Sequence, residues 1–213
     1  MMAIKMKVLD VSKYQPDINY ATTAKAVDGV ILRCGLTYWG KQDKAVDSCF
    51  EKHYKGFKAA GVPVGVYYYS AADSVAQAKA EAKKCLEIIK GKQFEFPIYF
   101  DMENPERQGA LSGKERYEIA DAFLSTVEAA GYFVGFYSYS SFIYEIGNTY
   151  FNKLAKKYTV WLADYRSKPA NYTRDMWQFT GSGRIKGING DVDLSYCYRD
   201  FPKIIKKVKL NGF

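Results

Sequence analysis

The stretch EFPIYFDMEN, residues 95–104, decides the prediction of the fold, because an apolar strand runs directly into two carboxylates. Its Phe, Ile and Tyr residues are typical of a buried strand. Alternate residues of a strand share a face, so Tyr99, Asp101 and Glu103 point the same way. At a rise of about 3.3 Å per residue, the two carboxylates lie about 7 Å apart at Cα. Burying a charge is costly unless it is paired or used in chemistry, so this strand end is a candidate functional site.

Seven further stretches have the composition of strands, bounded by Gly, Pro, Asn or Asp. With the first, they cover residues 6–11, 29–35, 62–70, 96–103, 132–140, 158–165, 175–181 and 190–196. Helical patterns cover residues 43–60, 74–90, 112–130 and about 149–157. Strands that alternate with helices predict an α/β protein with a parallel sheet. Eight strands with only about five helical connections predict an irregular barrel that ends in a set of bare strands.

The length and composition indicate one domain over residues 1–213, with a barrel core over about 6–196 and a basic tail or helix over 197–213. No run approaches the roughly 18 apolar residues of a membrane span, so we expect no membrane partner. The net charge of +8 is spread along the chain, which indicates a solvated surface or long-range attraction to a polyanion such as a bacterial wall. No nucleic-acid-binding motif accompanies it, so we expect no nucleic-acid partner.

The cysteines and the histidine argue against two kinds of site. Cys34, Cys49, Cys85 and Cys197 form no C-x-x-C pair, and His53 is the only histidine. A zinc site needs Cys and His ligands in closer groups, so we expect no metal and no cofactor. A Ser-His-Asp or Cys-His hydrolase would have to use His53 as its base, and that residue lies far in sequence from the carboxylates.

Polar and aromatic side chains recur at the ends of the other strands, where βα barrels collect their functional groups. They include Asp10 in the first strand, Tyr67 in the third, Tyr137 in the fifth, Trp161 and Tyr165 in the sixth, Trp177 and Gln178 in the seventh, and Asp191 and Asp193 in the eighth. An acidic cleft walled by aromatic rings suits a carbohydrate. Two carboxylates in unequal environments can serve glycoside hydrolysis, one protonated as the acid and one ionised. A calcium site is the rival use of such a cluster, but the spacing of a calcium loop is absent.

At these residues the sequence resembles the glycoside hydrolase family 25 lysozymes, which are N-acetylmuramidases. The matching segments are DVSKYQPDINY, GVYYYS, YFDMEN, GFYSYS, VWLADY, MWQFTG and VDLSY, which follow one another over about residues 6–196. The resemblance implies an irregular TIM-like (β/α)5(β)3 barrel, the catalytic domain of a phage endolysin or bacterial autolysin. It also implies cleavage of the β-1,4 bond between N-acetylmuramic acid and N-acetylglucosamine in bacterial peptidoglycan, by a monomer.

Carried over by position, the resemblance implies that Glu103 is the general acid. It makes Asp101 the partner that either stabilises positive charge at the sugar or orients the substrate's 2-acetamido group, and it completes the acidic cluster with Asp10 and Asp193. The residues it implies for the groove are Tyr67, Tyr137, Trp161, Tyr165, Trp177 and Gln178. Ser195 stands where family members often have Asn, which leaves Asp191 as a minor rival to Asp193.

Three alternatives remain open from the sequence. A chitinase-like hydrolase would have D-x-x-D-x-D-x-E, but Tyr99 occupies the Asp position before Asp101. A glucosaminidase would cut the other glycosidic bond of the same polymer. A non-catalytic glycan-binding module would be expected to lack Glu103. The N-terminus has no apolar segment of a secretory signal, so action on the wall would require phage-type release, another export route or an excised domain.

Overall fold

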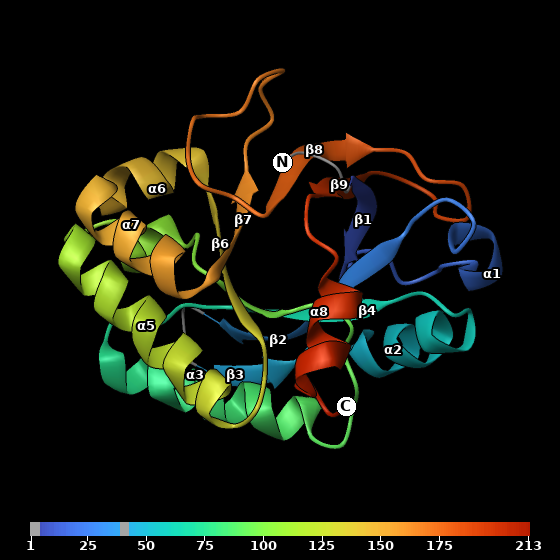
Figure 1. The fold of residues 1–213 in the computed structure, drawn as a ribbon, viewed down its shortest axis with the longest axis horizontal. Helices are drawn as coiled ribbons and strands as arrows, with labels where there is room; N and C mark the ends of the chain where they lie inside the picture. Colours follow the sequence, from blue (N-terminus) through green and yellow to red (C-terminus); the bar gives the residue numbers. More distant parts are fainter. Residues whose placement is uncertain (1–4, 39–42) are drawn as a thin grey trace.

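Eight strands close into a barrel in the computed structural model, which describes residues 5–38 and 43–213 (Figure 1). Around the barrel the strands follow the order β1, β9, β8, β7, β6, β5, β4 and β2, and β2 pairs back with β1. Their bounds are β1 Met6–Val11, β2 Gly29–Tyr38, β4 Val64–Tyr69, β5 Ile98–Asp101, β6 Val134–Tyr139, β7 Thr159–Ala163, β8 Met176–Gly183 and β9 Val192–Cys197. All eight predicted strands and the irregular (β/α)5(β)3 barrel are therefore confirmed.

The direction of the last strand differs from the predicted parallel sheet. Strands β1, β2 and β4 to β8 run parallel, whereas β9 is antiparallel to both β8 and β1. Only residues 184–191 connect β8 to β9, and a parallel crossover needs a longer connection, usually a helix. The start of β9 therefore lies at the rim where the parallel strands end.

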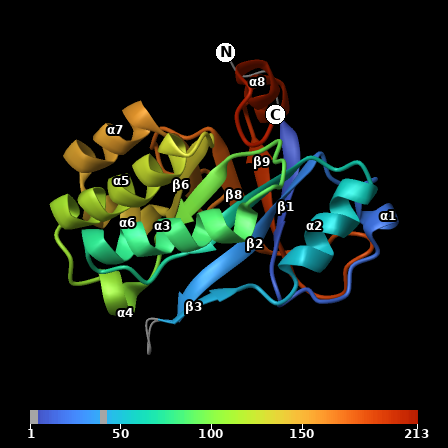
Figure 2. The ribbon, with the colours of Figure 1, turned by 90° about the horizontal axis from the view of Figure 1, so that it is seen from below.

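The helices flank the barrel in two groups. Helices α3, α5, α6 and α7 lie together on one side, and α1 and α2 lie on the other (Figures 1 and 2). Their bounds are α1 Tyr20–Thr23, α2 Phe50–Ala59, α3 Val75–Ile89, α4 Pro105–Gln108, α5 Gly113–Ala129, α6 Ser140–Ile146, α7 Asn148–Lys157 and α8 Phe201–Val208. Helices α3, α5 and α7 confirm three of the four predicted helices.

The predicted helix over residues 43–60 is wrong in its first part. Residues Asp43–Val46 form strand β3, which pairs antiparallel with the end of β2, and α2 begins only at Phe50. The break comes at Asp47, whose carboxylate accepts hydrogen bonds from the backbone N–H groups of Cys49 and Lys13. The β2–β3 hairpin thus departs from the barrel sheet beside the ends of β1 and β4.

Helix α8 closes the opposite end of the barrel. Phe201 is fully buried, and its ring lies 6.0 Å from that of Phe96 and 5.8 Å from that of Phe133, measured between centroids. Beyond the helix, the Asn211 side chain donates to the carbonyls of Phe94 and Phe96 and accepts from the N–H of Phe133. These contacts join the loops that lead into β5 and β6, so the end of the barrel away from the carboxylates is sealed.

Candidate active site

Four carboxylates meet at the rim where the parallel strands end. Asp10 lies near the end of β1, Asp101 is the last residue of β5, and Glu103 follows two residues later. Asp193, near the start of β9, lies directly opposite Asp10 in the sheet. All four side chains line one cavity of about 150 Å³. The structure therefore brings together the acidic cluster expected from the sequence.

The alternation along β5 separates the carboxylates from the core. Phe100 and Met102 are fully buried in the apolar layer between barrel and helices, and the Phe100 ring lies 4.6 Å from that of Phe123. Tyr99 and Asp101 point into the barrel instead. The strand thus directs apolar side chains outward and the carboxylates inward, as its sequence predicts.

Neighbouring strands hold the backbone around Glu103. The Asp101 carbonyl accepts from the Ser70 N–H at 3.0 Å, and the Met102 N–H donates to the Tyr137 carbonyl at 3.1 Å. The Ser138 hydroxyl donates to the Met102 carbonyl at 2.6 Å. The segment that carries both carboxylates is therefore attached to β4 on one side and to β6 on the other.

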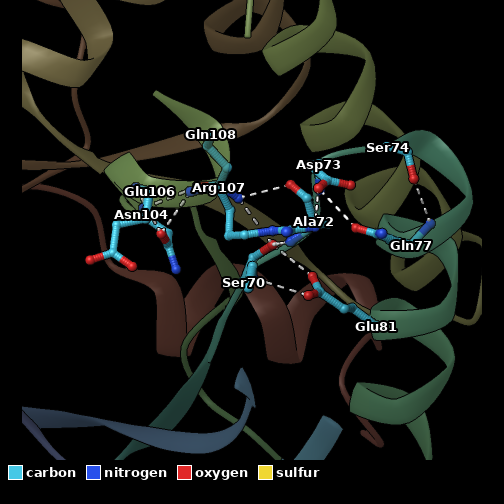
Figure 3. A network of polar contacts seen from close by, with 11 residues as sticks. Ser70, Ala72, Asp73, Ser74, Gln77, Glu81, Asn104, Glu106, Arg107 and Gln108 are labelled. Atoms are coloured by element: carbon cyan, nitrogen blue, oxygen red, sulfur yellow. Dashed lines mark hydrogen bonds and ion pairs between the residues drawn. The ribbon is translucent and has the colours of Figure 1, made fainter. Parts of the chain in front are cut away.

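A buried polar network continues this support beyond Glu103 (Figure 3). Fully buried Gln108 accepts from the N–H of Asn104 at 3.0 Å and donates to the Ala72 carbonyl at 3.1 Å and the Ser70 hydroxyl at 3.4 Å. The Ser70 hydroxyl in turn donates to the buried Glu81 carboxylate at 2.6 Å. Gln108 therefore joins the residue after Glu103 to the loop that follows β4.

The environment of Glu103 favours its protonated form near neutral pH. Burial raises the pKa of Glu103 to about 7, a hydrogen bond from Tyr137 lowers it, and the charge of Asp193 raises it. The Tyr137 hydroxyl has one proton and also lies 3.0 Å from the Gln178 amide oxygen, so the two acceptors compete for it. A carboxylic acid with a pKa near 7 is suited to general acid catalysis.

Asp10 and Asp193 form a carboxyl pair that favours a shared proton. Burial and then the charge of Asp193 raise the pKa of Asp10 well above its usual value, and burial raises the pKa of Asp193 as well. Gln178 opposes this by donating to the Asp10 carboxylate at 3.0 Å. Two carboxylates this close cannot both ionise easily, so one of them retains a proton.

Asp101 lies between Glu103 and a buried arginine. Burial and then the charge of Glu103 raise the pKa of Asp101 well above its usual value, while the nearby Arg33 guanidinium lowers it. The Asp101 Oδ1 atom is buried without a hydrogen-bond partner among the described residues. Protonation of Glu103 removes one of the causes that raise the pKa of Asp101, after which burial still opposes the carboxylate and Arg33 favours it.

Aromatic side chains and Gln178 form the walls and floor of the cavity. The hydroxyls of Tyr137 and Tyr165 both donate to the Gln178 amide oxygen at 3.0 Å. Trp161 is almost fully buried, and its indole N–H donates to the Ser195 hydroxyl at 3.0 Å. Tyr67 completes the lining. Five of the six residues expected in the groove therefore line this cavity, with Trp161 as its floor.

Trp177 is the exception. Its neighbour Gln178 points into the cavity, so strand alternation turns Trp177 to the outside of the barrel. There its ring packs against Phe179 and Tyr196, and its indole N–H donates to the Asp164 carbonyl at 2.7 Å. Trp177 therefore does not line this cavity, since adjacent residues of one strand face opposite sides.

The structure distinguishes the two candidate aspartates at the start of β9. Asp191 precedes the strand, is exposed and pairs with Arg184 at 3.1 Å. Asp193 faces inward with Ser195, which is fully buried. The acidic cluster therefore contains Asp193 and not its rival.

A second cavity, of about 500 Å³, adjoins the carboxylates and is lined by residues that the sequence reading missed. They are Lys13, Tyr14, Arg33, Thr37 and Tyr38. Arg33 is 7% exposed and donates from Nε to Asp47 at 2.7 Å. The signal that could have revealed it is a charged residue inside the apolar run GVILRCG, residues 29–35.

The described residues were compared with the requirements of a metal site and of a membrane-spanning helix. Within residues 5–38 and 43–213, no group of three or more His, Cys, Asp or Glu side chains is arranged to hold a metal ion. None of the helices there combines the length and the apolar character that crossing a membrane requires.

Comparisons with known proteins place the chain among related sequences. The model of the family "Glycosyl hydrolases family 25" matches residues 9–188. The uncharacterized protein YegX of Escherichia coli O157:H7 is 31% identical over 192 residues, which cover 88% of this chain and 67% of YegX. The autolytic lysozyme of Clostridium acetobutylicum is 28% identical, over 89% of this chain and 55% of the lysozyme.

A solved structure shares the fold. The modular autolysin LytC of Streptococcus pneumoniae superposes with a TM-score of 0.78 at 28% identity, over 91% of this chain and 47% of LytC. LytC has also been solved in complex with a synthetic peptidoglycan ligand. The chain thus spans about two thirds of the length of YegX and about half that of the two autolytic enzymes.

Proposed function

The chain belongs to glycosyl hydrolases family 25, and we propose that it hydrolyses peptidoglycan at the β-1,4 bond between N-acetylmuramic acid and N-acetylglucosamine. The membership confirms the family resemblance and the expected enzyme class, a glycoside hydrolase. A lysozyme among the relatives and a peptidoglycan complex of LytC support peptidoglycan as the substrate. Action at the bacterial wall, by a monomer, is part of the same proposal.

The observation that carries the proposal is the buried Glu103, with a pKa of about 7, in a cavity shared with three aspartates. Protonated Glu103 donates its proton to the glycosidic oxygen as the bond from that oxygen to the sugar C1 breaks. The leaving sugar departs as an alcohol, and positive charge develops at C1 and the ring oxygen. Water then supplies the hydroxyl at C1, and its remaining proton returns to a carboxylate.

Asp101 is the partner of Glu103 in this proposal. Its ionised form, favoured by Arg33 once Glu103 is protonated, either stabilises the positive charge or accepts the N–H of the substrate's 2-acetamido group. Its carboxylate lines the cavity beside Glu103, which is the position that either role needs. Asp10 and Asp193, which share a proton, act as a hydrogen-bonding wall whose orientation Gln178 maintains.

The test is the digestion of purified peptidoglycan, followed by chemical reduction and identification of the new sugar ends. Reduced muramic acid supports the proposal. Reduced glucosamine would make the protein a glucosaminidase, and the absence of new ends would make it a glycan-binding module. Glu103→Gln serves as the inactive control, with a loss of about 10²–10⁴ in rate.

A further inference from the structure

The exposed aromatic side chains of the described residues are not scattered over the surface. Among the described residues, four aromatic side chains are strongly exposed: Tyr14 at 73%, Tyr38 at 44%, Tyr144 at 77% and Tyr165 at 59%. Every one of them lines a cavity in a series that passes through the four carboxylates. Exposed apolar groups gathered along one feature mark a binding surface.

The cavities join because neighbouring ones share residues. The cavity of about 500 Å³ with Tyr14 and Tyr38 shares Glu103 with the central one. On the other side, a cavity of about 450 Å³ also includes Glu103, together with Tyr165 and Arg166. It shares Arg166 with a cavity of about 290 Å³ that contains Tyr144. We call this series the groove; it extends from Tyr14 past the carboxylates to Tyr144 on α6.

The Tyr14 ring, at one end of the groove, is held in place by a buried arginine. The guanidinium carbon of Arg33 lies 5.2 Å from the centroid of the Tyr14 ring, within the range of a cation–π contact. Arg33 is itself buried and tied to Asp47 at 2.7 Å. A ring positioned by a buried ion pair, yet 73% exposed, offers a fixed apolar face to a ligand.

The surroundings of Tyr144 at the other end suit a polar ligand. Its cavity contains Ser140, Ser141 and Arg166 as hydrogen-bonding groups. Arg166 is held in place by its ion pair with the Asp164 carboxylate. An aromatic face with polar groups around it matches a sugar ring, which has an apolar C–H face and a rim of hydroxyls.

We propose that Tyr14 and Tyr144 are distal sugar-binding platforms at the two ends of the groove, which hold a glycan strand of N-acetylated amino sugars across the cleavage point. This inference rests on the proposed function, since it takes the carboxylates as the place of cleavage. Affinity for the glycan then increases with strand length until the strand reaches both platforms. The central carboxylates alone would bind short and long strands equally well.

The test measures binding of peptide-free glycan strands by titration calorimetry, in a Glu103→Gln background that prevents turnover. Tetra-, hexa- and octasaccharides of alternating N-acetylglucosamine and N-acetylmuramic acid are the probes. Tyr144→Ala should weaken octasaccharide binding about 5- to 10-fold, as expected for one lost aromatic contact, with a smaller loss for shorter strands. Tyr144→Phe keeps the ring and should keep the affinity. Val208→Ala, an exposed apolar change on α8 at the closed end, is the matched control.

Two results would overturn the proposal. An equal loss at all strand lengths would mean that Tyr144→Ala distorts the central site, and no loss at any length would mean that Tyr144 is no platform. Because turnover is not measured, length-dependent binding can hold even if peptidoglycan digestion yields no muramic acid ends, so the two proposals fail separately.

Discussion

Replacing Glu103 by Gln should make the folded protein more stable above neutral pH while it removes activity. Burial is the first cause of the raised pKa of Glu103, which is about 7 in the folded state against a usual value of 4.5. Below pH 4.5 the carboxyl is protonated in both the folded and the unfolded chain. Between 4.5 and 7 only the unfolded chain loses the proton, so the stability that this group contributes is lost as the pH rises through 7.

The size of the effect follows from the shift. A difference of 2.5 between the two pKa values, at about 1.4 kcal/mol per pKa unit, corresponds to roughly 3 kcal/mol of folding free energy. Gln resembles the protonated carboxyl and does not ionise. The variant should therefore match the wild type near pH 4 and exceed its stability by roughly 3 kcal/mol above pH 8.

The measurement is urea unfolding of both proteins at several pH values between 4 and 9. Glu128→Gln, an exposed change near the end of α5, controls for the loss of one negative charge. Wild-type kcat/KM should also fall as the pH rises through 7, because the same proton is the one donated to the substrate. A stability difference that stays constant with pH would refute the assignment of a buried, protonated Glu103.

Three further predictions concern the site and the fold. Asp101→Asn should strongly impair peptidoglycan hydrolysis while Asp191→Asn changes it little; the reverse order in rate assays would place the wrong aspartate in the cluster. Gln108→Met should lower kcat about 10-fold and stability by about 2–4 kcal/mol, because it leaves the Asn104 N–H without its partner. Unchanged kcat in steady-state assays would make Gln108 merely structural. Asn211→Gly should cost about 2–4 kcal/mol in urea unfolding through three lost side-chain hydrogen bonds, since Gly tolerates the positive φ of 59°. Its kcat should be normal, and reduced kcat would contradict the separation of the closed end from the carboxylates.

Local chain geometry explains which features were predictable from the sequence. The strands, three of the helices and the shared face of Asp101 and Glu103 follow from short-range periodicity and turn residues, which the linear sequence displays directly. The alternation of side chains along a strand also predicts that Trp177, next to Gln178, points away from the cavity. The strand at residues 43–46 could not be predicted from its own residues, because it pairs with the end of β2, which lies outside that segment.

How the carboxylates meet, and which of them hold protons, follows from contacts between strands that are distant in the sequence. Asp193 faces Asp10 because β9 runs antiparallel to its neighbours, and Arg33 reaches Asp101 from another strand. The pKa of Glu103 depends on burial by residues far away along the chain, which no local pattern encodes. Short-range periodicity specifies which side chains point inward, whereas the closure of the barrel specifies what they meet there, because contacts between distant strands exist only in the folded chain.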